Sequence, residues 1–196
     1  MTFEEIKTIL SGKKVGIAGC GGLGSNCAVA LARIGVGTLV IADFDVISES
    51  NLNRQCYFYD QIDQKKAPAL KSNIARINPL INVVASDVKI TKENFAALFA
   101  GCDVVVEAFD MAAEKEMLIE TMLDKFPSIP LVIGIGMAGW GKNELIHYRR
   151  VDNIHICGDE ISEIGSDLPP LAPRVGIVAN MQANVVVEIL LEKNVK

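Results

Sequence analysis

Short apolar runs alternate with segments of helical periodicity along most of this 196-residue chain. The apolar runs are rich in β-branched residues and predict strands at 14–18, 38–42, 82–85, 103–107 and 130–135. The segments between them predict helices at about 22–34, 65–77, 92–100 and 112–126. Because strands that alternate with helices form βαβ units, the pattern predicts an α/β fold with a doubly wound, mostly parallel sheet and helices on both faces.

The pattern changes after residue 134, where a glycine-rich stretch precedes a polar run at 143–151. This run alternates well enough to predict one more strand, a C-terminal antiparallel extension of the sheet. Pro173 suits the first turn of a final helix through Leu191, because its fixed φ matches that position and its missing N–H costs nothing there. The helix carries a polar stripe, either a solvated face or a seam between subunits, at Asn180, Asn184 and Glu188.

The charge balance narrows the class of partner. Lys and Arg number 19 against 24 Asp and Glu, which gives a formal net charge of −5. A general nucleic-acid or anionic-membrane binder needs a basic surface, so we expect no nucleic-acid partner and no membrane partner. An anionic ligand would need a local basic cluster, which the chain offers at Arg54, Lys65, Lys66 and Lys71.

The length suits a single domain over 1–196 with a full hydrophobic core.

Targeting signals and a cysteine framework are not visible. The start of the chain, MTFEEIKTIL, has acidic residues where a signal peptide needs a basic region followed by an apolar stretch. The most apolar long window, 175–191, contains amide side chains and a glutamate, which disfavours a bilayer span. The five cysteines include no C-x-x-C pair, a pattern that suits reduced thiols. We therefore expect a cytoplasmic protein.

A glycine-rich turn lies between the first predicted strand and the first predicted helix. It reads G-x-G-x-x-G: Gly19 allows the tight turn, Gly21 lets a phosphate or ribose approach the backbone, and Gly24 lets the helix pack closely on the strand. The helix N-terminus adds unpaired N–H groups and a partial positive charge. With Gly22 and Leu23, the loop is a candidate nucleotide site, and a glycine turn without a ligand is the alternative.

The second predicted strand ends at Asp43, where an acid accepts hydrogen bonds from ribose hydroxyls. This feature does not separate NAD from ATP. Asn51, Arg54 and Lys66 follow closely, and a dehydrogenase has no need of them. A site for a triphosphate needs such residues, because a carboxylate can attack a phosphate only where cations offset the repulsion between the two anions.

The segment 43–55, DFDVISESNLNRQ, together with the downstream lysine, resembles the ThiF/MoeB/HesA family of adenylating enzymes, which are related to ubiquitin-activating enzymes. The resemblance runs from about residue 14 to 191 and is most like a short ThiF-type protein. It implies a Rossmann-like fold and ATP-dependent adenylylation of the C-terminal glycine of a ubiquitin-like sulfur carrier (ThiS-like), with release of pyrophosphate. The implied carrier ends in Gly-Gly, the implied pathway is thiamine biosynthesis, and the implied assembly is a homodimer that uses ATP and Mg²⁺.

The family pattern also implies roles for individual residues. Asp43 holds the ribose, Asn51 and Arg54 contact the phosphates, and Lys66 compensates charge at the α-phosphate. Lys65 is the adjacent alternative, and Lys66 is preferred because the family usually places its lysine just before an Ala- or Val-led helix.

The fourth predicted strand leads to Asp110, where the family has a Mg²⁺-binding Asp that is commonly followed by Asn. Met111 replaces that Asn, but one Asp suffices because Mg²⁺ keeps waters and phosphate oxygens as its other ligands. The structural alternative for Asp110 is an N-cap for the next helix. Asp45 is either a second metal or ribose contact or an ordinary loop acid, and Gln55 either steadies the phosphate loop or is structural. The predicted catalytic residues are Arg54, Lys66 and Asp110.

The chain also departs from the family pattern. Many relatives bind zinc through two C-x-x-C pairs, and the lack of such pairs here predicts no structural zinc. Cys157 is the candidate thiol for a persulfide or thioester, with a buried packing role as the alternative. The basic N-terminal motif that the family contributes across the dimer is not visible. Trp140, between two glycines, is a candidate lining for the groove that takes the carrier's glycine tail.

Other functions compete with activation of a sulfur carrier. Some relatives adenylate a carboxylate on a modified tRNA nucleoside, an interpretation that the acidic chain disfavours. A nucleotide-sensing or scaffold module without catalysis is compatible with the missing zinc pairs and the missing N-terminal motif. An NAD-dependent dehydrogenase is disfavoured by the phosphate-binding residues and by the lack of room for a substrate domain.

Overall fold

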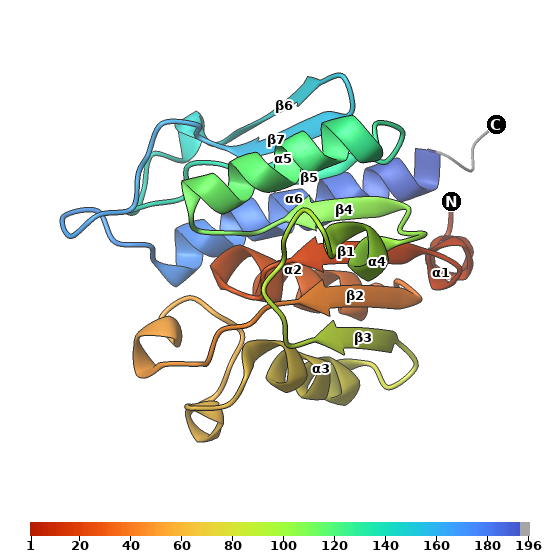
Figure 1. The fold of residues 1–196 in the computed structure, drawn as a ribbon, viewed down its shortest axis with the longest axis horizontal. Helices are drawn as coiled ribbons and strands as arrows, with labels where there is room; N and C mark the ends of the chain where they lie inside the picture. Colours follow the sequence, from red (N-terminus) through yellow and green to blue (C-terminus); the bar gives the residue numbers. More distant parts are fainter. Residues whose placement is uncertain (193–196) are drawn as a thin grey trace.

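The computed structural model describes residues 1–192, and within them seven strands form one sheet in the order β3-β2-β1-β4-β5-β7-β6 (Figure 1). Neighbouring strands pair in parallel except β6 and β7, which pair antiparallel. The strands are β1 (Lys14–Ala18), β2 (Thr38–Ala42), β3 (Asn82–Ser86), β4 (Val104–Glu107), β5 (Leu131–Gly134), β6 (His147–Val151) and β7 (Ile154–Gly158). The helices are α1 (Phe3–Ser11), α2 (Gly22–Arg33), α3 (Lys66–Ile77), α4 (Phe95–Phe99), α5 (Ala112–Lys125) and α6 (Ala172–Glu192). Short 3₁₀ turns occur at η1 (Glu49–Asn51), η2 (Tyr59–Gln61) and η3 (Asn143–Leu145).

Helices cover both faces of the sheet (Figure 1). On one face, side chains of α2, α3 and α6, such as Leu31, Leu70 and Val186, share a buried core with β1 and β2. On the other face, α4 and α5 contribute Phe95 and Leu118 to a second buried cluster. Because the central strands are buried on both faces, their sequences are nearly continuous apolar runs, and this is the pattern that predicted them.

The predicted fold class and the antiparallel extension are confirmed. β1 and β2 coincide with their predicted ranges, and Pro173 lies in the first turn of α6 as predicted. The predicted strand at 143–151 is wrong at its start, where η3 forms instead, and the predicted helix at 92–100 shortens to α4. α1 and β7 were not among the elements predicted from the sequence.

The final helix, α6, is long and apolar enough to cross a membrane by length and composition alone. Half of its most apolar window is buried inside the protein, however, which is typical of a core helix. Its polar stripe, Asn180, Asn184 and Glu188, is exposed, which leaves a solvated face and a subunit seam as alternatives.

The strand order reverses between β1 and β4. The chain leaves β1 to form β2 and β3 on one side, and later forms β4 and β5 on the other side of β1. The loops after these strands gather at one edge of the sheet, at the left of Figure 1. In open parallel sheets a ligand crevice lies at this reversal point, beyond the carboxyl ends of the strands.

Candidate functional site

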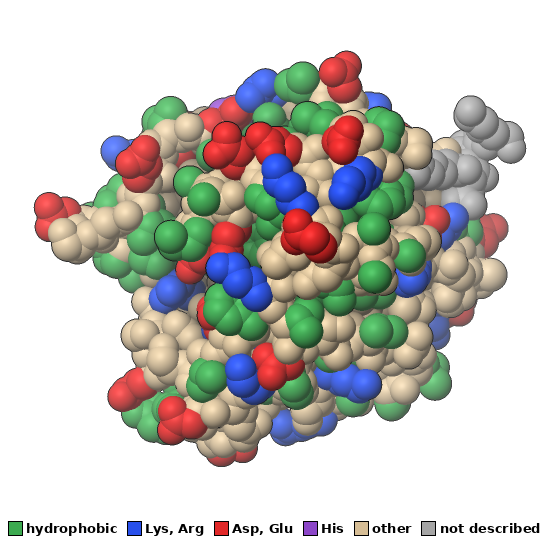
Figure 2. Space-filling view, viewed as in Figure 1, with side chains coloured by type: hydrophobic (Ala, Val, Ile, Leu, Met, Phe, Trp, Pro, Cys, Tyr) green, Lys and Arg blue, Asp and Glu red, His purple; other side chains and the backbone are tan. Residues whose placement is uncertain are grey.

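A cleft of about 690 Å³ lies at this carboxyl edge. Its walls come from the glycine loop, the loops after β2, β3, β4 and β5, the start of α3, and residues within 162–170. Figure 2 shows acidic and basic side chains interspersed over the face that carries α5, without a large patch of one sign. The charged side chains in the cleft lining include Asp43, Asp45, Arg54, Lys66 and Asp110.

The glycine loop has the shape that its sequence predicts. Gly19 has a φ of 98°, which favours glycine, and a Cβ there would lie 2.8 Å from the carbonyl oxygen of Ala108. At Gly24 a Cβ would collide with the carbonyl oxygen of Gly19, so α2 packs directly on the turn. Gly21 is the N-cap of α2, whose N-terminus therefore borders the cleft. The loop residues that line the cleft are Gly19, Gly21, Gly22 and Leu23.

Asp43 fastens the glycine loop to the end of β2. One carboxylate oxygen accepts a hydrogen bond from the Cys20 N–H at 2.6 Å, and the other accepts from the Asp45 N–H at 2.8 Å. Burial raises the pKa of Asp43, and the two N–H bonds and the nearby Lys66 act in the opposite direction. A carboxylate has about four acceptor positions, so two backbone donors leave capacity for ribose hydroxyls.

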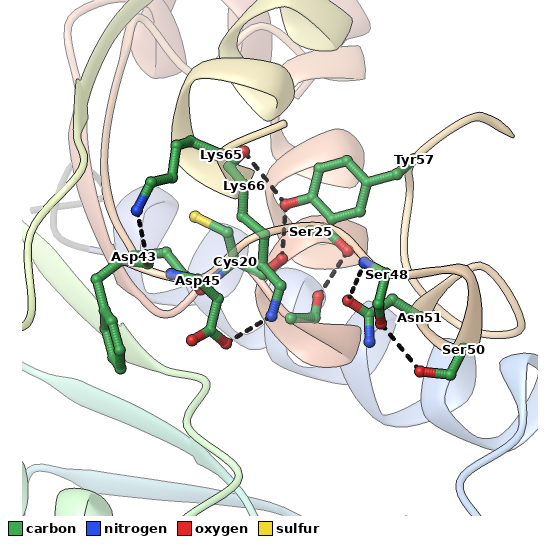
Figure 3. A network of polar contacts seen from close by, with 12 residues as sticks. Cys20, Ser25, Asp43, Asp45, Ser48, Ser50, Asn51, Tyr57, Lys65 and Lys66 are labelled. Carbon is green, nitrogen blue, oxygen red and sulfur yellow. Dashed lines mark hydrogen bonds and ion pairs between the residues drawn. The ribbon is translucent and has the colours of Figure 1, made fainter. Parts of the chain in front are cut away.

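Lys66, the first residue of α3, lines the cleft, whereas Lys65 does not. Figure 3 shows both lysines among their polar contacts. The Lys66 side chain is 8% exposed, and its Nζ donates to Oδ2 of Asp45 at 2.7 Å. The Nζ of Lys65 instead donates to the carbonyl oxygen of Phe44 at 2.9 Å and lies 3.3 Å from Asp87. This geometry favours Lys66 over Lys65 as the lysine that meets a ligand.

Arg54 and Gln55 also line the cleft. The Nη1 of Arg54 donates to the carbonyl oxygen of Ser50 at 3.0 Å, which holds the guanidinium beside its own turn. The Gln55 side chain is buried, and its Oε1 has no hydrogen-bond partner in the described part of the chain. A buried acceptor without a partner is costly, so a ligand donor at this position would stabilise it.

Two residues of the predicted phosphate site lie elsewhere. Asn51 is not part of the cleft lining, because its Oδ1 accepts a hydrogen bond from the Ser48 N–H at 3.1 Å within η1 (Figure 3). Lys71 is exposed on α3 and does not reach the cleft. Of the basic cluster predicted from the sequence, Arg54 and Lys66 line the cleft.

Asp110 is exposed in the cleft and forms no hydrogen bond or ion pair with other residues of 1–192. It does not cap α5, whose N-cap is Met111 without a side-chain bond, so the N-cap alternative is wrong. Asp45 lines the same cleft. Among the described residues, no group of three or more His, Cys, Asp or Glu could hold a metal ion. A cation here would need oxygens from a ligand and water besides Asp110, which is how Mg²⁺ is usually bound.

Residues 134–137 and 162–164 line the side of the cleft that we call the far wall. Arg174 of α6 holds the loops behind it: the Nη2 of Arg174 donates to Oδ2 of Asp159 at 2.6 Å, and its Nη1 donates to the carbonyl oxygen of Gly141. The other oxygen of Asp159 accepts from the N–H groups of Ile161 and Ser162. Burial raises the pKa of Asp159, but these bonds outweigh it and hold the pKa at about 2.

Two further candidates from the sequence lie outside the cleft. Cys157 is fully buried in β7, and burial raises its pKa to about 12. The structure therefore favours its packing role over a reactive thiol. Trp140 is 67% exposed and lines a separate hollow of about 80 Å³ instead of the main cleft.

The cleft also contains charged side chains that the sequence analysis missed. The Nζ of Lys89 lies 3.3 Å from Glu114 and 5.5 Å from the centroid of the Phe44 ring. Glu114 and Lys115 belong to the beginning of α5, which starts at the carboxyl edge of the sheet. Charged residues at the start of such a helix are the signal that would have found them. The missed residues are Lys89, Glu114, Lys115 and Glu163.

The reversal of strand order, the glycine loop and the acid at the end of β2 define a nucleotide-binding α/β protein. Its buried lysine and its arginine distinguish it from a dinucleotide-dependent dehydrogenase. The chain belongs to the ThiF family, whose model matches residues 3–196. This membership places it among adenylyltransferase enzymes.

The relatives differ in substrate. The chain is 27% identical over 191 residues to the molybdopterin-synthase adenylyltransferase of Salmonella typhimurium. The matched region covers 95% of this chain and 76% of that protein. It is 36% identical over 137 residues to the tRNA threonylcarbamoyladenosine dehydratase of Bacillus subtilis, covering 69% of this chain and 53% of that protein. Among solved structures, the Escherichia coli tRNA N6-threonylcarbamoyladenosine dehydratase in complex with ATP has a TM-score of 0.87 at 21% identity, over 97% of this chain and 90% of that chain. This structural likeness supports the fold.

Proposed function

We propose that this chain catalyses ATP-dependent adenylylation of the C-terminal glycine of a ubiquitin-like sulfur carrier and releases pyrophosphate. One observation carries the proposal: a single cleft holds Arg54 and Lys66 at one end and continues to the glycine-bounded far wall at the other. An extended peptide with a C-terminal Gly-Gly has no side chains at its end, so it suits a wall that begins with Gly134 and Gly136.

The charges in the cleft suit attack by a carboxylate on the α-phosphate. Two anions repel each other, and at about 4 Å with an effective dielectric near 20 one cation–phosphate contact contributes on the order of 4 kcal/mol. Arg54 and Lys66 would supply these contacts. The Lys66 ammonium donates to the Asp45 carboxylate, which holds it in the cleft where a phosphate could compete for it.

The residues present fit one Mg²⁺ ion bound together with ATP. Asp110 offers a carboxylate with no partner within the described residues, and it lies in the same cleft as Asp45. When bound, the ion would neutralise phosphate charge and favour departure of pyrophosphate. Asp43 would hold the ribose, and Gln55 would donate or accept at the phosphate loop.

The test is ATP–pyrophosphate exchange with the purified chain and a co-encoded carrier that ends in Gly-Gly. Exchange that depends on the carrier, and that is lost when its last glycine is removed, supports the proposal. Absence of exchange with every co-encoded Gly-Gly carrier contradicts it.

The cellular setting belongs to the same proposal. A ThiS-like carrier and thiamine biosynthesis are the pathway expected from the sequence, and a homodimer in the cytoplasm is the expected state. The names of the relatives support carrier activation in general, since the Salmonella protein serves molybdopterin synthase. Because Cys157 is buried, a sulfur donor other than this thiol would attack the adenylate.

A second candidate is adenylylation of a carboxylate on a modified tRNA nucleoside. It is favoured by the 36% identity to the Bacillus subtilis dehydratase. The test is to incubate the chain and ATP with tRNA that carries threonylcarbamoyladenosine. Dehydration of that nucleoside, together with salt-sensitive tRNA binding, would replace the first proposal with this one.

A further inference from the structure

A second ion pair, whose carboxylate is fully buried, borders the cleft where β4 and β5 end. Glu107, the last residue of β4, is 0% exposed, and its two carboxylate oxygens accept from the Nζ of Lys115 at 2.9 and 2.8 Å. The same Nζ donates to the carbonyl oxygen of Gly134 at 3.1 Å. An ammonium group has three donors, so Lys115 lines the cleft with none of them left for a ligand.

Stability alone does not account for this pair. Removing two charges from water costs about as much as their attraction returns, and apolar residues of similar volume are often at least as stabilising. Burial raises the pKa of Glu107, and the charge of Lys115 acts in the opposite direction. The protein therefore keeps two charges at a position where an apolar pair would serve a purely structural purpose.

The bonds of this pair converge on the turn that leads to Asp110. Oε1 of Glu107 also accepts from the Phe109 N–H at 2.6 Å, which fixes the backbone immediately before Asp110. From the opposite face of the sheet, the Nε2 of Gln182 donates to the backbone carbonyl oxygen of Glu107 at 3.1 Å. The bond from Lys115 to Gly134 ties this turn to the first residue of the far wall.

We propose that Glu107 and Lys115 form a positioning unit that holds the Asp110 carboxylate where Mg²⁺-bound ATP meets the far wall. The inference rests on the proposed function, because it takes Asp110 as a ligand of the ion. Both members act through Asp110, because the Nζ of Lys115 is engaged by protein acceptors and Glu107 is fully buried. Groups that orient a metal ligand typically change metal affinity by about 10- to 100-fold when they are removed.

The test measures ATP binding to the whole chain by calorimetry over a range of Mg²⁺ concentrations. Glu107→Met together with Lys115→Met removes both charges without leaving one of them buried alone. We expect an unfolding midpoint no lower than that of the wild type, and a rise of about 10-fold or more in the Mg²⁺ concentration for half-maximal ATP binding. The matched control is Lys92→Met with Glu120→Met, an exposed Lys–Glu pair whose N–O distance is 2.7 Å and which also anchors α5. It should leave the Mg²⁺ requirement unchanged.

Asp110→Asn supplies the second arm of the test. It should raise the Mg²⁺ requirement by itself, and adding the two Met substitutions of the positioning unit should raise it no further. Lys115→Arg keeps the charge and should stay near the wild type. If the Met pair does not fold, Glu107→Gln, which keeps an acceptor for the Phe109 N–H, should raise the requirement in the same direction by a smaller factor.

The inference is overturned by any of three results: the Met pair behaves like the control, its effect adds fully to that of Asp110→Asn, or Asp110→Asn has no effect. Failure of the adenylylation proposal would be recognised separately. In that case Mg²⁺-dependent ATP binding would persist without carrier-dependent pyrophosphate exchange.

Discussion

The two sides of the cleft are built in different ways. The nucleotide side comes from one stretch, Gly19 to Lys66, and its main fastening is the pair of backbone N–H bonds to Asp43. The far wall joins distant segments, and it depends on the buried pair Asp159–Arg174 and on the pair Glu107–Lys115, whose carboxylate is buried. Residues with positive φ also occur in and near this wall: Gly136, Gly139, Gly141, Lys142, Gly158 and Glu160.

This difference separates two uses of charge. On the nucleotide side, Arg54 and Lys66 stand in the cleft, where a ligand can compete for them. Near the far wall, the charges of Lys115 and Arg174 are engaged by protein acceptors and serve to hold loops. Substitutions on the first side should therefore change rates, and substitutions on the second side should change stability or geometry.

The largest effect is expected from breaking the Asp159–Arg174 pair. Arg174→Leu leaves the buried carboxylate of Asp159 without its cation and should lower the free energy of unfolding by about 3–5 kcal/mol, measured by urea denaturation. The matched control is Arg149→Leu, since Arg149 pairs with Glu160 at the surface and its side chain is 50% exposed. The control should change stability by less than about 1 kcal/mol. Equal losses in the two variants would contradict the role given to the buried pair.

Next in size is the effect of removing the cleft lysine. Lys66→Ala should slow carrier-dependent ATP–pyrophosphate exchange by about 10²–10³, because a preorganised cation at the transferring phosphate is lost. Thermal unfolding should change little, since the partner, Asp45, is 46% exposed. Lys65→Ala is the control and should retain near-normal exchange, because Lys65 points away from the cleft toward Asp87. A reversed order of the two variants would reassign the site to Lys65.

A smaller effect is expected at Cys157. Cys157→Ala should lower the free energy of unfolding by about 1 kcal/mol through lost packing, with pyrophosphate exchange unchanged. Cys157→Ser should destabilise more, because it buries a hydroxyl among apolar groups. Trapping of a carrier thioester that disappears in the Ala variant while its fold is intact would show that the thiol reacts after all.

The last effect concerns acid stability. The pKa of Asp159 is about 2 in the folded protein against an ordinary value of 3.8, so its stabilising contribution is present above about pH 4 and is lost as pH falls toward 2. Thermal unfolding of Asp159→Asn should therefore depend less on pH in this range than that of the wild type. The pKa of Asp43 is shifted upward, so Asp43→Asn should instead make the acid loss of stability steeper. If Asp159→Asn and Asp43→Asn unfold with the same pH dependence, the opposite pKa shifts given to the two carboxylates are contradicted.

The sequence was most informative where structure depends on neighbours along the chain. Buried parallel strands are recognisable as apolar runs, and the glycine loop and Asp43 lie where their spacing predicts. The capping box between Thr2 and Glu5 was a readable signal for α1 that was overlooked. β7 was missed because it is a short run between irregular segments, without the alternation that predicted β6.

The far wall could not be predicted in the same way. Arg174 follows Pro173 in a sequence that suits any helix start, and only the fold brings it against Asp159. In the sequence, Glu107 is a polar residue at the end of a predicted strand. In the fold it is fully buried and pairs with Lys115, and the sequence pattern does not indicate this partner. The phosphate contact that the family pattern implies for Asn51 stays a prediction, and the structure places its Oδ1 as the acceptor for the Ser48 N–H within the local turn.

The antiparallel strand β6 lies at the edge of the sheet within residues 1–192, and all its side chains are exposed. An edge strand has unpaired backbone N–H and C=O groups, and a strand of another chain can pair with them and start aggregation. His147 and Arg149 of this strand pair with Glu160, whereas Arg150 forms no ion pair within the described residues, so two copies that approached edge to edge would bring uncompensated positive charge together. We therefore expect the strand that completes the sheet to disfavour edge-to-edge association of two copies.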